Sequence, residues 1–173
     1  MDELVDVLDV NGVPTGKTVL KSVAHREGIL HPVAHVWIYT GAGMVLLQKR
    51  SFSKEVYPGL WDVSMGGHIS AGEDIIQGAL REIKEELGKQ FSAGNLRPAF
   101  IHSTDEDLGT LKVREVIHVF LCRCDDPISS YAAQESEVDD IKFFSFDSPP
   151  SNIVPRPEYH RKVRAALKNQ LHQ

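Results

Sequence analysis

The stretch that decides the fold is residues 67–88, GHISAGEDIIQGALREIKEELG. Its apolar residues recur three and four positions apart, which predicts an amphipathic helix with one face in a core. Glu82, Glu85 and Glu86 fall within an arc of about 100° beside that face, because each residue of an α-helix turns by about 100°. The helix is therefore expected to carry a row of carboxylates along one edge of its buried face.

These three glutamates repel one another. Like charges three or four residues apart destabilise an isolated helix by roughly 0.2–0.5 kcal/mol for each pair. A divalent cation would offset the repulsion, since Mg²⁺ binds a few protein carboxylates together with waters and the phosphates of a substrate. A solvated acidic surface has the same sequence pattern, so the glutamates alone leave both interpretations open.

The residues around the glutamates follow a longer pattern. Five residues separate Gly67 from Glu73, and seven more separate Glu73 from Arg81, which begins the run REIKEELG. This spacing resembles the Nudix box, G-x5-E-x7-R-E-U-x-E-E-x-G-U with U an aliphatic residue, at every fixed position but the last. Lys89 stands at that position, which changes the packing expected after the helix but removes no expected metal ligand. A match at eight specified positions over 22 residues is far more specific than a lone glycine motif.

Length and composition fit one ordinary globular domain. The chain has 173 residues, and no apolar run approaches the roughly 20 residues that cross a bilayer. Its N-terminus lacks the basic and then apolar pattern of a signal peptide. We therefore expect a single cytoplasmic domain over residues 1–173, without a membrane partner. A formal charge of −5 argues against polymeric nucleic acid, which calls for a basic surface.

The chain reads as strands, one helix, more strands and a final helix. Asn11-Gly12 favours the tight turn of an N-terminal hairpin, and Ser70 with Glu73 fits a capping box before the central helix. Pro157 begins a C-terminal helix. Strands are expected at residues 4–8, 13–20, 33–40, 44–50, 61–65, 99–103, 113–124 and 141–146. This order is typical of an α+β fold, which the Nudix resemblance specifies as an α/β/α sandwich with a mixed sheet.

Resemblance to the Nudix family also implies how the chain is divided and what it does. The core would span residues 32–150, extended by the hairpin segment at 1–31 and by a C-terminal helix at 156–172. Nudix hydrolases use Mg²⁺ or Mn²⁺ while water attacks a phosphorus of a nucleoside diphosphate joined to another group. Divalent ions suit this reaction because they neutralise the diphosphate oxygens, which otherwise repel the nucleophile. We therefore expect a small-molecule diphosphate substrate, and many relatives are dimers, which leaves a homodimer open.

The box positions imply a metal site. By resemblance, the ligands would be the backbone carbonyl of Gly67 and the carboxylates of Glu82, Glu85 and Glu86. In the same way, Arg81 looks like the partner of Glu73, so that the pair would hold the loop against the helix.

The reaction also needs a carboxylate that accepts a proton from the attacking water. The box offers Glu85 and Glu86 for this step. Some Nudix enzymes use an acid from a different loop, for which Glu115 and Glu137 are the candidates, and Glu137 precedes the strand DDIKFF, where related enzymes often carry one. The sequence does not decide between these residues.

A second resemblance lies outside the box. The segments LHPVAHVWIY and LLQKRSFSKEVYPGLWDVSMGGH look like the Nudix branch that includes isopentenyl diphosphate isomerase. Arg50 and Lys54 match two cations that bind the diphosphate in that isomerase, where charge-assisted hydrogen bonds are favourable. His31 and His68 match histidines that bind metal there, while His25 is one residue out of step with the third.

Gly66 separates the two activities of this branch. It stands where the isomerase has its catalytic cysteine, and glycine has no group that moves a proton across a double bond. The leading hypothesis is therefore a Nudix hydrolase. The alternatives are an isomerase and a non-catalytic module that binds a nucleotide. Gly66 argues against the isomerase, and the intact box glutamates argue against the non-catalytic module. The group attached to the diphosphate stays open, because the box contacts only the shared diphosphate.

Overall fold

The structure is a computed structural model that describes residues 2–134 and 136–171. Residue 172, the last of the expected C-terminal helix, lies outside the described residues. The strands are β1 Leu4–Leu8, β2 Pro14–Leu20, β3 His31–Tyr39, β4 Met44–Arg50, β5 Trp61–Asp62, β6 Met65–His68, β7 Arg97–Asp107, β8 Lys112–Arg123 and β9 Val138–Ser145. The α-helices are α1 Lys21–Glu27, α2 Ile75–Leu87 and α3 Pro157–Leu171, with short 3-10 turns at Ala93–Asn95 and Ile128–Ser130. Within the described residues, no helix is long and apolar enough to cross a membrane.

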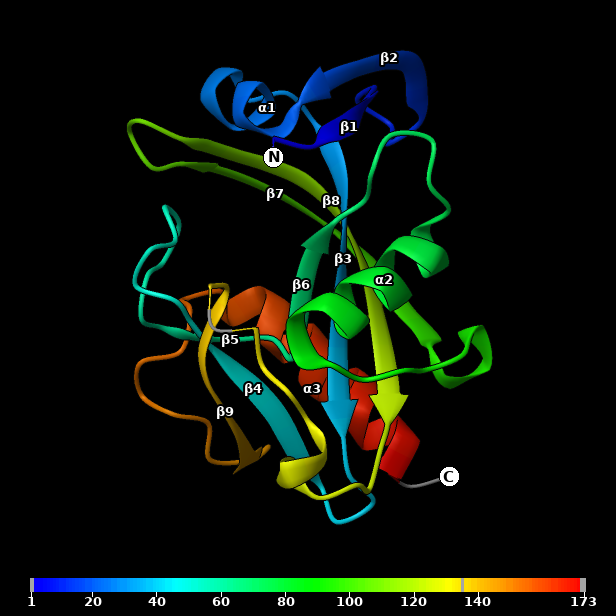
Figure 1. The fold of residues 1–173 in the computed structure, drawn as a ribbon, viewed down its shortest axis with the longest axis vertical. Coiled ribbons are helices and arrows are strands. Elements are labelled where there is room, and N and C mark those ends of the chain that lie inside the picture. Colours follow the sequence, from blue (N-terminus) through cyan, green and yellow to red (C-terminus); the bar gives the residue numbers. More distant parts are fainter. Residues whose placement is uncertain (1, 135, 172–173) are drawn as a thin grey trace.

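A mixed sheet forms the centre of the molecule (Figure 1). Its main path runs β5-β4-β3-β8-β7, while β6 pairs with β3 and β9 pairs with β4. β3 and β8 run parallel, and the remaining pairs of this sheet are antiparallel. β1 and β2 form a separate hairpin around the turn at Asn11-Gly12. The expected α+β fold with a mixed sheet and an N-terminal hairpin is confirmed.

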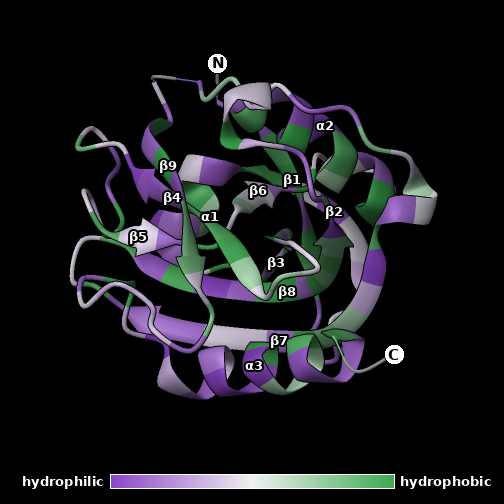
Figure 2. Cartoon of the chain, turned by 90° about the horizontal axis from the view of Figure 1, so that it is seen from below, coloured by the Kyte–Doolittle hydropathy of each residue, from purple (hydrophilic) through white to green (hydrophobic). Residues whose placement is uncertain are grey.

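Helices α2 and α3 cover opposite faces of the sheet (Figure 2). β3 shows how both faces are filled, because its side chains alternate between them. Ala34, Val36 and Ile38 pack in the apolar cluster that contains α2, whereas Trp37 and Tyr39 pack in the cluster that contains α3. Every residue of β3 is buried, as expected of a strand covered on both sides.

The start of α2 lies one turn later than the sequence predicted. Its N-cap is Asp74, whose carboxylate accepts hydrogen bonds from the backbone N–H groups of Ile76 and Gln77 at 3.0 and 3.2 Å. The expected capping box of Ser70 and Glu73 is wrong. The Glu73 side chain does accept from the Ser70 N–H at 3.1 Å, but this contact closes a turn in the preceding loop. The cap goes to Asp74 because it directly precedes the first helical residue.

Three other elements differ from the sequence prediction. The strand expected at residues 61–65 is two short strands, because β5 pairs with β4 while β6 pairs with β3. The acidic segment after residue 103 continues β7 as far as Asp107, since each of these residues pairs with β8. Helix α1 has no counterpart in the prediction. Its seven residues show too little apolar periodicity, and it ends at Gly28 in the left-handed conformation, with φ of 68°.

The N-terminal hairpin packs on the loop that leads into α2. The Ala71 N–H donates to the Leu4 carbonyl at 2.8 Å, and the Gly72 N–H donates to the Asp6 carboxylate at 2.9 Å. Val5 is completely buried beneath this contact. The hairpin therefore forms part of the wall around the box loop rather than a free appendage.

Candidate active site

A cavity of about 810 Å³ is bordered by α2, β6 and the loop at residues 51–60. Most of its lining side chains are charged, which suits an ionic ligand. Lys21 and Glu3 also reach it from the N-terminal segment, and sequence reasoning missed both because neither belongs to a recognisable motif. The lining residues that the sequence did single out are His25, Arg50, Lys54, Gly66, Gly67, His68, Arg81, Glu82, Glu85, Glu86, Glu115 and Glu137.

The three box glutamates lie in different environments on α2. Glu85 is exposed, Glu82 is mostly buried, and Glu86 is buried with its Oε2 making no hydrogen bond to a described residue. Burial raises the pKa of Glu86 to about 8, and the charge of Glu82 adds to this effect while Lys54 opposes it. Burial also raises the pKa of Glu82. A cation beside these carboxylates would stabilise their ionised forms.

These residues fit a hard divalent cation. Mg²⁺ and Mn²⁺ favour carboxylate and carbonyl oxygens, and the buried Oε2 of Glu86 is such an oxygen with no other partner among the described residues. A Cβ at Gly67 would collide with the Glu82 side chain, so glycine allows the loop backbone and this carboxylate to approach each other closely. The structure thus brings together Gly67 and the box glutamates at one wall of the cavity.

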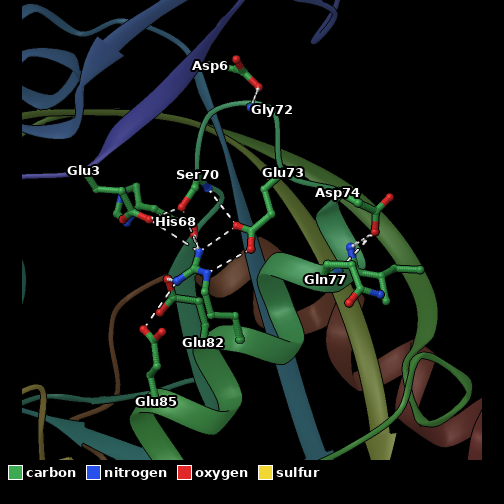
Figure 3. A network of polar contacts seen from close by, with 12 residues as sticks. Glu3, Asp6, His68, Ser70, Gly72, Glu73, Asp74, Gln77, Glu82 and Glu85 are labelled. Carbon is green, nitrogen blue, oxygen red and sulfur yellow. Dashed lines mark hydrogen bonds and ion pairs between the residues drawn. The ribbon is translucent and has the colours of Figure 1, made fainter.

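Arg81 connects the box loop to the carboxylate edge of α2. Figure 3 labels its partners His68 and Glu73 ahead of the helix and Glu82 on the helix. Its Nε and Nη2 donate to the two oxygens of Glu73 at 3.0 and 2.8 Å, and Nη2 also donates to the His68 carbonyl at 3.2 Å. Its Nη1 donates to Glu82 at 2.7 Å and lies 3.5 Å from a carboxylate oxygen of Glu85. The pKa of Arg81 is raised, chiefly by the hydrogen bonds to Glu73. This arginine therefore fixes the loop and two of the box glutamates relative to each other.

Two cations singled out by the sequence line the same cavity. Lys54 forms a close ion pair with Glu137, and burial lowers the pKa of Lys54 while the charge of Glu86 acts in the opposite direction. Arg50 donates from Nε to the Val56 carbonyl at 2.8 Å and from Nη1 to the Asp62 carboxylate at 3.3 Å. Both cations are therefore held within reach of an anionic ligand in this cavity.

A second group of ligand atoms is formed by His25, His31, His68 and Glu115, hereafter the His–Glu cluster. One ligand atom from each residue lies within 4.8 Å of the others. Glu115 Oε1 is 3.7 Å from His25 Nε2, 4.0 Å from His31 Nε2 and 3.9 Å from His68 Nε2. The sequence offset of His25 does not keep it from the cluster, because α1 and the turn at Gly28 bring its ring beside the other two.

The protonation states of the His–Glu cluster suit a metal ion. His31 Nδ1 donates to the Ile29 carbonyl at 2.8 Å, so the buried Nε2 carries a lone pair, and this atom has no hydrogen-bond partner in the described part of the chain. Burial lowers the pKa of His31 and holds that of His68 well below its ordinary value. Burial would raise the pKa of Glu115, but the polar contact with His25 and the nearby rings of His68 and His31 hold it at about 2. Three imidazoles and a carboxylate form a donor set that suits Zn²⁺ or Mn²⁺.

Comparison with known proteins gives the family. A family model of the NUDIX domain matches residues 29–167, so the chain belongs to the Nudix family. It is 33% identical over 151 residues to Nudix hydrolase 3 of Arabidopsis thaliana, which covers 84% of this chain but only 20% of that protein. It is also 32% identical over 123 residues to an isopentenyl-diphosphate Delta-isomerase of Escherichia coli, covering 70% of this chain and 66% of that protein.

Solved structures agree on the fold. A structure from Deinococcus radiodurans superposes with a TM-score of 0.68 at 21% identity, covering 84% of this chain and 85% of that one. The family and the isomerase-like branch that the sequence predicted are therefore confirmed, and so is the hydrolase class at the level of the family. Gly66, where the resemblance places the isomerase cysteine, lines the cavity and has no acidic or basic side chain.

Proposed function

We propose that this chain hydrolyses the phosphoanhydride bond of a small diphosphate in a reaction that depends on Mg²⁺ or Mn²⁺. The observation that carries the proposal is the buried Glu86 carboxylate, whose Oε2 makes no hydrogen bond to any described residue, beside Glu82 and Gly67 in a charged cavity. A buried carboxylate is costly unless a cation or hydrogen bonds compensate it. Membership of the Nudix family supports the same reaction class, and a nucleoside diphosphate derivative is the substrate class that we propose.

The carboxylates of Glu82, Glu85 and Glu86 and the backbone carbonyl of Gly67 would hold the metal. When bound, a divalent ion neutralises charge on the diphosphate oxygens and lowers the pKa of the attacking water. Glu86 is available for this role because its Oε2 has no other partner among the described residues.

The remaining polar side chains would bind the diphosphate or position the metal ligands. We propose that Arg50 and Lys54 donate hydrogen bonds to the diphosphate oxygens, since charge-assisted bonds of this kind are strong. Arg81, paired with Glu73, would hold the loop and the helix at the separation that the ligand set requires.

The carboxylates proposed to accept the proton from water are Glu85, Glu86 and Glu137. Glu85 is the most exposed of the box glutamates, and Arg81 Nη1 lies 3.5 Å from its carboxylate. Its carboxylate is therefore the most accessible to water. Glu86 is buried, and Glu137 is paired with Lys54. Replacing each by glutamine and following kcat against pH separates them, because loss of the base removes the acidic limb of the profile.

A second candidate function is isomerisation of an isopentenyl diphosphate. The His–Glu cluster favours it, because three imidazoles and a buried carboxylate converge beside the cavity, and a relative carries that activity in its name. Gly66 argues against it, since no thiol stands at that position. A purely nucleotide-binding module would have no need for a buried Glu86 whose Oε2 lacks a partner among the residues that the structure describes.

The deciding experiment is a screen of small diphosphates with Mg²⁺, Mn²⁺ or EDTA, following release of phosphate or nucleotide. We expect hydrolysis with either metal, loss in EDTA, and a large loss in Glu82→Gln. Glu158→Gln, an exposed residue at the start of α3, is the matched control and should leave the rate unchanged. Conversion of isopentenyl diphosphate to its dimethylallyl isomer without hydrolysis would establish the isomerase instead, and binding without turnover would establish the module.

The proposal extends to partners and location. The charge of −5 supports a small-molecule substrate rather than polymeric nucleic acid. We also propose a cytoplasmic homodimer. Light scattering after size-exclusion chromatography tests the dimer, and failure to retard duplex DNA or RNA in a gel tests the exclusion of nucleic acid.

A further inference from the structure

A further cation lines the cavity, and the proposed metal and diphosphate sites assign no role to it. Arg156 directly precedes α3, and only 10% of its side chain is exposed. Its buried Nε makes no hydrogen bond within the part of the chain that the structure describes. Its Nη1 lies 3.6 Å from Asp62 and its Nε lies 3.7 Å from Glu106, both beyond ordinary hydrogen-bond distance.

Both carboxylates near Arg156 already have closer partners. Asp62 accepts a hydrogen bond from Arg50 at 3.3 Å through its other oxygen, and Glu106 accepts one from the Tyr57 hydroxyl at 2.6 Å. Two guanidinium groups therefore share the buried Asp62. A buried guanidinium with unmade hydrogen bonds is unfavourable unless a ligand supplies the acceptors.

The surroundings hold this guanidinium in place. Its central carbon lies 5.7 Å from the centre of the Tyr57 ring, a distance typical of a cation–π contact. Tyr57 has a φ of 50°, a left-handed conformation that is costly for a residue other than glycine. Strained positions of this kind persist where the surrounding contacts fix them. The Tyr57 ring is therefore a fixed support that holds the Arg156 guanidinium at the cavity.

We propose that Arg156 binds a second anionic group of the substrate, a phosphate or a carboxylate carried by the group attached to the diphosphate. The inference rests on the proposed function for its choice of substrates. A guanidinium offers parallel N–H donors that match either anion in a two-pronged contact, and the shared chemistry is an oxyanion. Arg156 is thus a specificity-determining residue, and the enzyme prefers diphosphates with this additional anionic group over the counterparts that lack it.

Matched pairs of compounds test the inference. ADP-ribose is compared with ADP-ribose 2′-phosphate, and UDP-glucose with UDP-glucuronate, so that each pair differs by one phosphate or one carboxylate. We expect the wild type to favour the anionic member of one pair in kcat/KM, which also identifies the anion. Arg156→Gln should reduce this preference by about tenfold or more, because it removes charge-assisted hydrogen bonds. It should leave kcat/KM for the member without the extra anion nearly unchanged.

Two further variants keep the result interpretable. Arg161→Gln removes an exposed arginine five positions along the chain and should leave the preference intact. Arg156→Lys keeps the charge next to Asp62 if Arg156→Gln does not fold, but it loses the two-pronged geometry and should retain only part of the preference. Circular dichroism checks that each variant is folded.

Binding of the same four compounds, measured by calorimetry with Ca²⁺, separates this inference from the proposed hydrolysis. Tighter binding of an anionic member that depends on Arg156, together with no turnover of any of the four compounds in Mg²⁺ or Mn²⁺, supports the inference and refutes the hydrolase. Turnover with equal loss for both members of each pair, or no preference in the wild type, overturns the inference and leaves the hydrolase in place. Binding of none of the four compounds also overturns the inference.

Discussion

The two ligand clusters beside the cavity are built in opposite ways. Glu82, Glu85 and Glu86 come from two turns of one helix, so helical geometry alone sets their relative positions. The His–Glu cluster takes one residue each from α1, β3, β6 and β8. The pairing of β3 with β8 places His31 opposite Glu115, and no local pattern specifies that register. A site whose ligands lie close together in the sequence can therefore be predicted from a motif. A site whose ligands come from distant segments exists only after the sheet has formed.

The donor atoms of the two clusters also differ. The box offers carboxylate and carbonyl oxygens, which suit Mg²⁺ and other hard ions. The His–Glu cluster offers imidazole nitrogens with a single carboxylate, which suits Zn²⁺ or Mn²⁺ better. The two clusters should therefore respond to different metals and to different substitutions.

The largest effect is expected from Glu86→Gln in the box. Glutamine keeps the shape of the side chain but cannot balance a cation, so kcat/KM with Mg²⁺ should fall roughly 100- to 1000-fold as several kcal/mol of charge stabilisation are lost. Phosphate or nucleotide release measures the rate. A Glu86→Gln enzyme that works at the wild-type rate, alongside an unchanged Glu158→Gln control, would remove Glu86 from the metal site.

The next effect concerns stability. The same substitution that lowers activity, Glu86→Gln, should raise the stability of the protein at high pH. Without metal, burial raises the pKa of Glu86 from an ordinary value of 4.5 to about 8, so the folded state binds this proton more tightly than the unfolded state. The resulting stabilisation is complete below about pH 4.5 and is lost as the pH rises towards about 8. In EDTA, the free energy of unfolding should therefore fall by several kcal/mol over this range.

Glu86→Gln should remove this pH dependence, because glutamine does not titrate. Urea unfolding of both proteins at several pH values provides the measurement. The variant should be the more stable of the two near pH 8 while being far less active. Parallel curves for the two proteins would show that Glu86 is not the group responsible.

A smaller effect distinguishes the two clusters by metal. Glu115→Gln should weaken Zn²⁺ binding by roughly tenfold, because it removes the charged ligand of the His–Glu cluster, and should leave the Mg²⁺ requirement of hydrolysis unchanged. Glu86→Gln should show the reverse pattern. Calorimetric titration with each metal measures both affinities. If each substitution weakens both metals alike, the clusters do not act as separate sites.

The smallest effect concerns the entry to the box helix. Asp74→Ala removes the acceptor for two backbone N–H groups and should lower the free energy of unfolding by about 1 kcal/mol. Asp74→Ser keeps a cap and should lose only a few tenths. Urea unfolding at pH 7 measures the difference. An equal loss in both variants would mean that capping is not what Asp74 contributes.

Sequence reasoning succeeded where the determinants are close together along the chain. The turn at Asn11-Gly12, the apolar stripe of α2 and the spacing from Gly67 to Glu86 are all local, and the hairpin and the helix form as expected. It failed where two local solutions compete. The contact between Ser70 and Glu73 forms as the motif suggests, yet it closes a loop turn because Asp74 offers the cap nearer the helix.

It also failed where a residue's neighbour comes from elsewhere in the chain. His25 looks out of step with the pattern of the other histidines, but α1 and its left-handed end carry the ring to them. Arg156 belongs to no motif, and its burial beside Asp62 results from the docking of the segment before α3.

By itself, the sequence determined the Nudix family, the α+β fold and the row of carboxylates on α2, because short-range periodicity and spacing encode all three. Only the tertiary structure decided that Glu86 is buried with an oxygen that bonds to none of the described residues, that the His–Glu cluster exists, and that Arg156 lines the cavity. The physical reason is that burial and ligand convergence depend on which distant segments pack together, and strand pairing and layer packing settle that only in the folded chain.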